Sequence, residues 1–374
     1  MPRLLAAASL PALLLVVMAV SGSQLQTVVG GEPGSGTPAP EPEAVDRQAR
    51  ARIERVPLGL RSVPFPADNP PTTARIRLGR RLFLDGRLSS GGDLSCAACH
   101  QPEQGFASNK DRTAVGNHGK SLRRNSPSLF NVGFAAPFFH DGRQPELDLQ
   151  PLEVLVDPDE MAFPSLDAVV ARVKSLPGYE TLFEEAFNGS PSAERIGQAL
   201  GSYVRTLLSA NSPFDRWYFG GQTEAVTPAA KRGFFLFFGG AGCVECHRIT
   251  QEAALFTDHA FHDTGAARAG GDLGRYEVTH DPIHRWQIKT PILRNVALTG
   301  PYMHNGSLAT LGEVVDFYNR GGFPHEGIDP RIQPLGLSEQ EKADLVEFLE
   351  SLTGDNVGVL VRDARSDQVG NVSH

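Results

Sequence analysis

The sequence predicts a mostly helical, all-α protein made of two modules of similar design. Apolar residues recur at helical spacing in four segments, residues 166–173, 193–208, 311–318 and 338–352. No alternation of polar and apolar residues is long enough to predict a sheet. A weak internal repeat indicates two modules, because a basic and aromatic segment precedes a Gly-rich turn and a Cys motif twice.

The first 22 residues have the parts of a secretory signal peptide. Arg3 precedes an apolar run over residues 4–20, and small residues follow it. Ser9 and Pro11 interrupt this run, which is marginal in length for a membrane span. We therefore expect residues 1–22 to be removed after export to the periplasm, with no membrane span in the mature protein. A retained anchor is the alternative.

The chain that follows is predicted to be a linker and two domains. Gly, Pro, Ser, Thr and Glu dominate residues 23 to about 45, and such a composition buries too little apolar surface to fold. We expect a flexible linker over residues 23–55, an N-terminal domain over 56–213 and a C-terminal domain over 214–374. The last predicted helix begins at Ser338 with a capping-box pattern.

Composition excludes several classes of protein. The 43 acidic residues exceed the 35 Lys and Arg, for a net charge of -8, which argues against a nucleic-acid binder. A hydrophobic fraction of 40% is too high for a disordered chain. Four cysteines in 374 residues are too few for a disulfide scaffold.

All four cysteines belong to two Cys-x-x-Cys-His motifs. These are Cys96, Cys99 and His100 in the first module, and Cys243, Cys246 and His247 in the second. This spacing is the attachment signature of c-type haem, with the His as proximal iron ligand. A thioredoxin-like motif needs no His after the second Cys, and the pairs lie too far apart for a usual zinc site. We expect two cytochrome c-like domains, each with one covalent haem c.

Several further motifs occur in a fixed order along the chain. They are RNSPSLFN at 124–131, FHDGR at 139–143, Gln150 with Glu160, KTPILRNV at 289–296, LTGPYMHNG at 298–306 and ATL at 309–311, reaching Tyr318. On these motifs, residues 56–355 resemble the bacterial dihaem cytochrome c peroxidases and their MauG-like relatives. The resemblance implies a peroxidatic haem in the N-terminal domain and an electron-transfer haem in the C-terminal domain.

The resemblance also assigns the peroxide chemistry. Cleavage of the O–O bond needs a group that takes a proton from the near oxygen and returns it to the leaving oxygen. A carboxylate in a partly desolvated pocket can do this, because burial raises its pKa. The matching residue is Glu160, and Gln150 is its distal partner. The alternative is that Glu160 is one of several exposed acids in residues 157–160.

The sixth ligand of the second iron decides the branch of the family. The position at which classical members have Met holds Tyr318, as in MauG-like members. A phenolate stabilises oxidised iron more than a thioether does. The alternatives are that Tyr318 packs on the apolar face of a helix and that Met303 is the ligand.

The resemblance further implies a calcium ion held by the Asn125 side chain and by the backbone carbonyls of Thr299 and Pro301, which are oxygen ligands suited to a hard cation. Two positions depart from the family. His140 stands between the haems where the family usually has Trp, and His is harder to oxidise. His118 is either a ligand that blocks the first haem until reduction or an exposed loop residue.

We therefore expect an exported dihaem peroxidase that acts on hydrogen peroxide. Its electrons come either from a small carrier, such as a cytochrome c or a cupredoxin, or from residues of a partner protein. Tyr318 favours the partner protein. A non-enzymatic dihaem electron-transfer cytochrome is the alternative from another class, and it would need two saturated irons and no distal acid.

Overall fold

The computed structural model describes residues 42–108 and 111–367, and the predicted signal peptide and the start of the predicted linker lie outside these ranges. The described chain is mostly helical, as predicted, with only one two-stranded antiparallel sheet among its described residues. The sheet pairs β1 (Phe261–His262) with β2 (Ile288–Lys289). No helix in the described ranges combines the length and the apolar character needed to cross a membrane.

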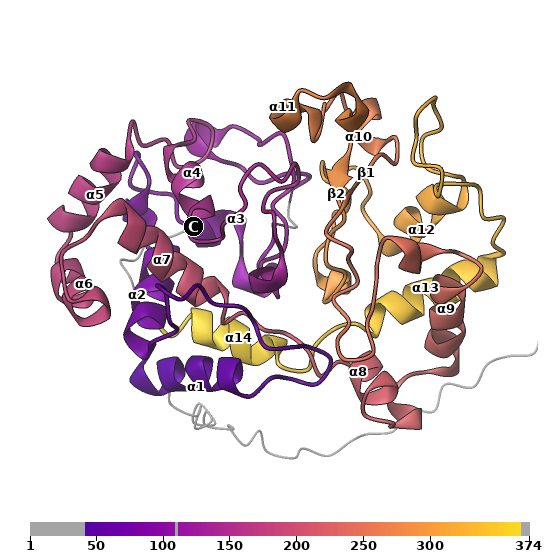
Figure 1. Ribbon diagram of the computed structural model, residues 1–374, viewed down its shortest axis with the longest axis horizontal. Helices are drawn as coiled ribbons and strands as arrows, with labels where there is room; N and C mark the ends of the chain where they lie inside the picture. The colour runs from indigo at the N-terminus through magenta and orange to yellow at the C-terminus, as the bar shows by residue number, and fades with distance from the viewer. Residues whose placement is uncertain (1–41, 109–110, 368–374) are drawn as a thin grey trace, which may run out of the picture. The chain divides into compact units, whose positions relative to one another are not determined.

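The helices are joined by loops and short helical turns, and the two short strands β1 and β2 lie between α9 and α12 in the chain (Figure 1). The longer ones are α1 (Pro42–Glu54), α2 (Thr73–Leu84), α4 (Gln150–Val156), α5 (Leu166–Ser175), α6 (Tyr179–Phe187), α7 (Ala193–Val204), α8 (Pro213–Tyr218), α9 (Pro228–Phe238), α12 (Leu311–Asn319), α13 (Glu339–Glu350) and α14 (Val357–Ala364). The four-residue helices are α3 (Cys96–Cys99), α10 (Ala266–Ala269) and α11 (Tyr276–Thr279).

The four helices predicted from periodicity are confirmed as α5, α7, α12 and α13. The capping box at the start of α13 is also confirmed, because Ser338 and Glu341 exchange both of its hydrogen bonds. Helix α7 ends at Val204, earlier than predicted. There the Thr206 N–H donates to the Tyr203 carbonyl, which turns the chain out of the helix while Leu207 stays buried.

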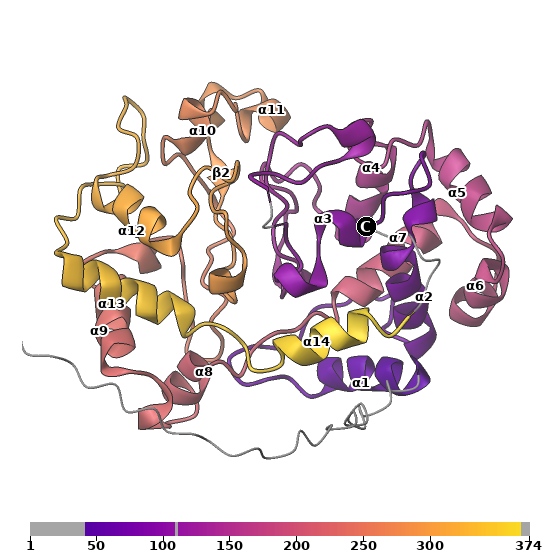
Figure 2. The same ribbon diagram turned by 180° about the vertical axis from the view of Figure 1, so that it is seen from behind.

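The two modules use the same helix crossing. Helix α2 packs against α7 in the first module, and α9 packs against α13 in the second (Figures 1 and 2). At each crossing a Gly lets the two backbones approach. A Cβ on Gly79 would lie 1.9 Å from the Ala199 carbonyl oxygen, and one on Gly233 would lie 1.9 Å from the Asp344 carbonyl oxygen. The internal repeat of the sequence therefore corresponds to a repeated packing arrangement.

Two hydrophobic cores correspond to these crossings. The first core is built from α2 and α7 together with residues such as Phe106, Phe130 and Phe183. The second core contains Phe214, Phe234 and Phe348, whose rings pack edge to face or tilted. The predicted boundary between residues 213 and 214 remains a prediction.

The structure corrects two parts of the predicted organisation. The predicted flexible linker over 23–55 is wrong for residues 42–54, which form α1. This helix is ordered by its buried Val45 and by an ion pair between Asp46 and Arg80, whose side chains are both buried. Helix α14 belongs by sequence to the predicted C-terminal domain, yet Leu360 and Ala364 lie in the first core.

Candidate active site

The first Cys-x-x-Cys-His motif is held in place by backbone hydrogen bonds. Its cysteines begin and end α3, and the His100 N–H donates to the Cys96 carbonyl at 2.9 Å. The His100 Nδ1 atom lies 3.1 Å from the Phe106 carbonyl oxygen. Because a carbonyl only accepts, Nδ1 carries the proton and Nε2 keeps the lone pair that an iron ion would take. Burial lowers the pKa of His100, so the ring is neutral and able to ligate.

The second motif has the same construction. The His247 Nδ1 atom lies 2.8 Å from the Phe256 carbonyl oxygen, which again leaves Nε2 for a metal. Burial lowers the pKa of His247 as well. None of the four thiols of the two motifs is in a disulfide. Both motifs thus present two thiols and one oriented imidazole, which is the donor set that covalent haem c requires.

A cavity of about 380 Å³ lies at the second motif. Its wall includes Cys243, Cys246 and His247, and Tyr318 of α12 also faces it. Burial raises the pKa of Tyr318, and the nearby Cys243 and Cys246 raise it by smaller amounts. The phenol therefore stays neutral unless a cation compensates the negative charge of the phenolate. Met303, the alternative ligand, lines the same cavity. The cavity and its donors fit a haem group.

Glu160 lies on a tight turn that follows α4. The Glu160 N–H donates to the Asp157 carbonyl at 3.1 Å, and the Ala162 N–H donates to the same oxygen at 2.8 Å. Burial, with a smaller contribution from the neighbouring Asp157, raises the pKa of Glu160 to about 7, although Arg143 acts to lower it. The charge of Glu160 in turn acts on the thiols of Cys99 and Cys96, so the carboxylate lies near the first motif. Glu160 is therefore not an ordinary exposed acid.

Gln150 and His118 complete the surroundings of Glu160. Gln150 is the first residue of α4 and is half-buried, so one short helix connects it to the Glu160 turn. His118 is exposed, in the short helical turn Asn117–Gly119. That turn is fixed to the Glu160 turn, because the Asn117 N–H donates to the Asp159 carbonyl at 2.9 Å. The loop interpretation of His118 matches its position.

The three residues expected to hold calcium all line the cavity. The Asn125 Nδ2 atom donates to the Pro301 carbonyl at 2.6 Å, while the Asn125 Oδ1 atom is buried and has no hydrogen-bond partner. A buried oxygen without a donor is costly unless a cation or a water satisfies it. Thr299 uses its hydroxyl to donate to the Val296 carbonyl. Its own carbonyl and that of Pro301 suit a hard cation beside Asn125.

His140 lies in the same region and is neutral. Its Nε2 atom lies 2.9 Å from the Asn125 carbonyl oxygen, so Nε2 carries the proton. Burial lowers the pKa of His140 to about 4, despite this hydrogen bond. A neutral, hydrogen-bonded imidazole positions the Asn125 backbone, and the expected place of His140 between the haems remains a prediction.

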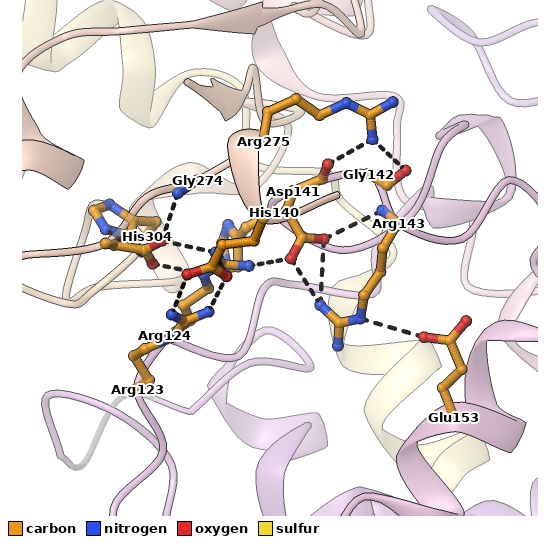
Figure 3. Close-up of polar contacts among 12 residues, drawn as sticks. Arg123, Arg124, His140, Asp141, Gly142, Arg143, Glu153, Gly274, Arg275 and His304 are labelled. Atoms are coloured by element: carbon orange, nitrogen blue, oxygen red, sulfur yellow. Dashed lines mark hydrogen bonds and ion pairs between the residues drawn. The ribbon is translucent and has the colours of Figure 1, made fainter. Parts of the chain in front are cut away.

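Sequence reasoning missed a buried ion network around Arg124 (Figure 3). Arg124 donates to both carboxylate oxygens of Asp272, at 2.7 and 2.8 Å, and to Asp141 at 2.6 Å. Burial alone would lower the pKa of Arg124, but the hydrogen bonds and negative charges of Asp272 and Asp141 together outweigh burial and raise it. The network joins the RNSPSLFN motif to the chain after β1. Arg124 stood in that motif, but no spacing indicated a partner 148 residues away.

Comparison with known proteins gives consistent matches. The sequence profile of the di-haem cytochrome c peroxidases matches residues 73–223. The chain is 41% identical over 302 residues to the methylamine utilization protein MauG of Methylorubrum extorquens, covering 80% of this chain and 83% of that protein. It is 35% identical over 329 residues to the cytochrome-c peroxidase IdrP1 of Denitromonas iodatirespirans, covering 79% and 86%.

Solved structures agree with these sequence matches. A MauG-like protein associated with microbial copper homeostasis is 32% identical, with a TM-score of 0.73 over 81% of this chain and 95% of that one. The diheme peroxidase BthA from Burkholderia thailandensis is 25% identical, with a TM-score of 0.67 over 77% of this chain and 87% of that one.

Proposed function

Because this chain belongs to the di-haem cytochrome c peroxidase family and is a haem peroxidase, we propose that hydrogen peroxide reacts on the His100 side of the molecule under the control of Glu160. The single observation that carries this proposal is the position of Glu160. Its carboxyl is largely buried near Cys96 and Cys99, and its pKa is about 7. An acid–base group works best when its pKa is close to the working pH.

The chain's own residues supply binding and proton transfer. Cys96 and Cys99 would hold one haem c and Cys243 and Cys246 the other, with His100 and His247 as the proximal ligands. When bound, the haem iron supplies the electrons that cleave the O–O bond of peroxide. Glu160 takes the proton from the near oxygen of peroxide and returns it to the leaving oxygen, which departs as water. Gln150, at the other end of α4, shapes the space in which peroxide binds.

The second site would handle the oxidising equivalents. His247 and Tyr318 face one cavity, so they can ligate one iron from two elements. A phenolate ligand favours the oxidised iron. This supports a MauG-like reaction in which the electrons come from residues of a partner protein. A small donor such as a cytochrome c or a cupredoxin is the alternative source. The chain would work in the periplasm after residues 1–22 are removed.

A calcium ion would hold the two modules together beside the haems. Its ligands would be the Asn125 side chain and the carbonyls of Thr299 and Pro301. The partnerless Asn125 Oδ1 atom supports this assignment. The ion would fix the chain on both sides of the cavity and take no part in proton transfer.

The test is a comparison of three holoproteins in a stopped-flow reaction with hydrogen peroxide. Glu160→Gln should slow the reaction about 10²–10⁴-fold, the range for one acid–base group. Asp159→Asn is the matched control, because Asp159 is the adjacent acid and pairs with the exposed Lys120. A Glu160→Gln rate equal to that of the wild type and of the control would remove Glu160 from the mechanism.

A further inference from the structure

Two segments of the chain, residues 125–142 and 289–306, have the same backbone course. One shift of 164 residues relates them. Asn131 and Asn295 both have a φ of 60°, and Phe139 and Met303 have φ values of 65° and 69°. Side chains other than Gly rarely adopt this left-handed region, so the matched values are a specific likeness.

The two segments also share their bridges. Phe138 pairs with Gln144, and Tyr302 pairs with Leu308, in isolated antiparallel bridges related by the same shift. The likeness therefore extends from single dihedral angles to the hydrogen bonding of each loop. Seven of the 18 residue pairs related by this shift are identical, among them Pro137 with Pro301 and His140 with His304, so the duplication is visible in the sequence as well.

The segments bind each other reciprocally. The Asn125 N–H donates to the His304 carbonyl at 2.7 Å, and the Lys289 N–H donates to the His140 carbonyl at 2.9 Å. The shift that relates Asn125 to Lys289 also relates His140 to His304. A pair of contacts in which each partner uses the same surface is the mark of two-fold symmetry. The two segments thus meet about an approximate two-fold axis.

The symmetry fails in one chemical detail. On one side of the axis the Asn125 amide nitrogen donates to the Pro301 carbonyl at 2.6 Å. On the other side the Lys289 ammonium donates to the equivalent carbonyl, that of Pro137, at 2.5 Å. Pro137 and Pro301 are related by the same shift. A neutral amide with a partnerless oxygen therefore faces one loop, and a cation faces the other.

We propose that the Lys289 ammonium is a built-in counterpart of the calcium ion, holding the Pro137 loop as the ion holds the Pro301 loop. This inference rests on the calcium site proposed above. A Lys ammonium is a compact point charge with hydrogen-bond donors, so it can satisfy carbonyl oxygens that a metal would otherwise bind. The chain thus needs one calcium ion where its symmetry offers two places.

Lys289 remains a cation at neutral pH. Burial lowers the pKa of Lys289 to about 8, which still leaves most of the amine protonated, and the carboxylate of Asp141 favours the charged form. The Lys289 ammonium is covalently attached to the chain and so is always present, whereas the occupancy of the calcium site at Asn125 depends on the calcium concentration. Chelation should therefore release the Pro301 loop, beside the second haem cavity, and leave the Pro137 loop in place.

Exchanging the two side chains tests the inference in the holoprotein, by metal analysis and thermal unfolding. Asn125→Lys should place an ammonium on the Pro301 carbonyl. Bound calcium should fall from about one ion per chain to near zero, and EGTA should no longer lower the Tm. The matched control Asn125→Leu also loses calcium but lacks the ammonium, so its Tm should equal that of EGTA-treated wild type.

The reverse exchange keeps the test decisive if Asn125→Lys fails to fold. Lys289→Asn places an amide oxygen beside the carbonyls of Ala135 and Pro137, which correspond by the same shift to those of Thr299 and Pro301. This change should raise bound calcium from about one ion to two. A Lys289→Asn protein that still binds one ion, or an Asn125→Lys protein that keeps its calcium, would overturn the counterpart role alone. A wild-type holoprotein without calcium would overturn the calcium site itself and the inference with it.

Discussion

Tyr318 and His247 face the same cavity although they come from different elements, α12 and the loop after the second Cys-x-x-Cys motif. Among the described hydrogen bonds, the Tyr318 hydroxyl takes part in none, whereas Nδ1 of His247 is oriented by the Phe256 carbonyl. One ring is thus fixed for ligation and the other presents a free oxygen to the same space. This pairing supports the proposal that His247 and Tyr318 would both ligate the second iron.

Replacement of Tyr318 should therefore change the second haem alone. Tyr318→Phe removes the phenolic oxygen and keeps the ring, so the low-spin ferric signal of one haem should be lost while the other is unchanged. Electron paramagnetic resonance of the diferric holoprotein measures both haems separately. Tyr302→Phe is the matched control, because Tyr302 lines the same cavity but donates its hydroxyl to the Val296 carbonyl at 3.0 Å. An unaltered spectrum of Tyr318→Phe would discard the ligand.

The rate of the peroxide reaction should rise as pH increases through about 7. Burial raises the pKa of Glu160 from 4.5 to about 7, and only the deprotonated carboxylate can take the first proton. The same shift means that the folded protein binds this proton more tightly than the unfolded chain does. Glu160 therefore lowers the folding stability progressively as pH rises above 4.5. The loss levels off above about 7, where the carboxyl is deprotonated in both the folded and the unfolded chain.

Both effects should disappear in Glu160→Gln. Its peroxide reaction should be slow and nearly independent of pH between about 5 and 9, where the wild type shows a single titration. Stopped-flow rates at constant ionic strength measure this. A wild-type profile with its midpoint near the ordinary carboxyl value would show that Glu160 is not the titrating base.

Arg124 should be far more important for stability than its neighbour Arg123. The Arg124 side chain is 10% exposed and binds Asp272 and Asp141, which are 4% exposed. Arg124→Gln removes the Arg partner of the buried Asp272 and leaves Asp141 with Arg143 alone, which should lower the free energy of unfolding by about 3–5 kcal/mol. Denaturant unfolding followed by the haem absorbance measures the change.

Arg123→Gln is the control for that experiment. Arg123 is 57% exposed and its ion pair with Glu277 is screened by solvent. Its loss should cost less than about 1 kcal/mol. Equal costs for the two variants would mean that the Arg124 network is not buried in solution.

His118→Ala should leave the first haem unchanged. The imidazole is exposed, and the hydrogen bonds from its turn to the Glu160 turn come from the backbone and side chain of Asn117. The ferric spectrum of the first haem and its peroxide rate should therefore equal those of the wild type. A new high-spin signal in His118→Ala would show that this ring ligates the iron in the holoprotein.

The family and its haem peroxidase function were easier to predict from the sequence than the long-range packing. Cys96, Cys99, Cys243, Cys246 and the two following His residues were recognisable because covalent attachment requires a fixed local spacing. Helix α1 was missed because its charged sequence has few apolar residues, and Asp46 becomes buried only by pairing with Arg80, a residue distant in the chain.

The contacts between the modules could not be predicted for the same reason. Asp272 carries no motif, and its role arises only when folding brings it to Arg124. The different contacts of Asn125 and Lys289 were also hidden, since the matching segments that follow them, SPSLFNV and TPILRNV, do not show which carbonyl each side chain reaches. Local spacing therefore predicted the donor sets, while long-range pairing determines how they are held.

The most direct test of the account is an optical titration of the purified diferric holoprotein with hydrogen peroxide, before any reductant is added. With Glu160 poised near the first haem and His118 exposed, the Soret band should shift at once and both haems should change. No change until one electron has been added would contradict an open first site and would indicate that a ligand such as His118 blocks it.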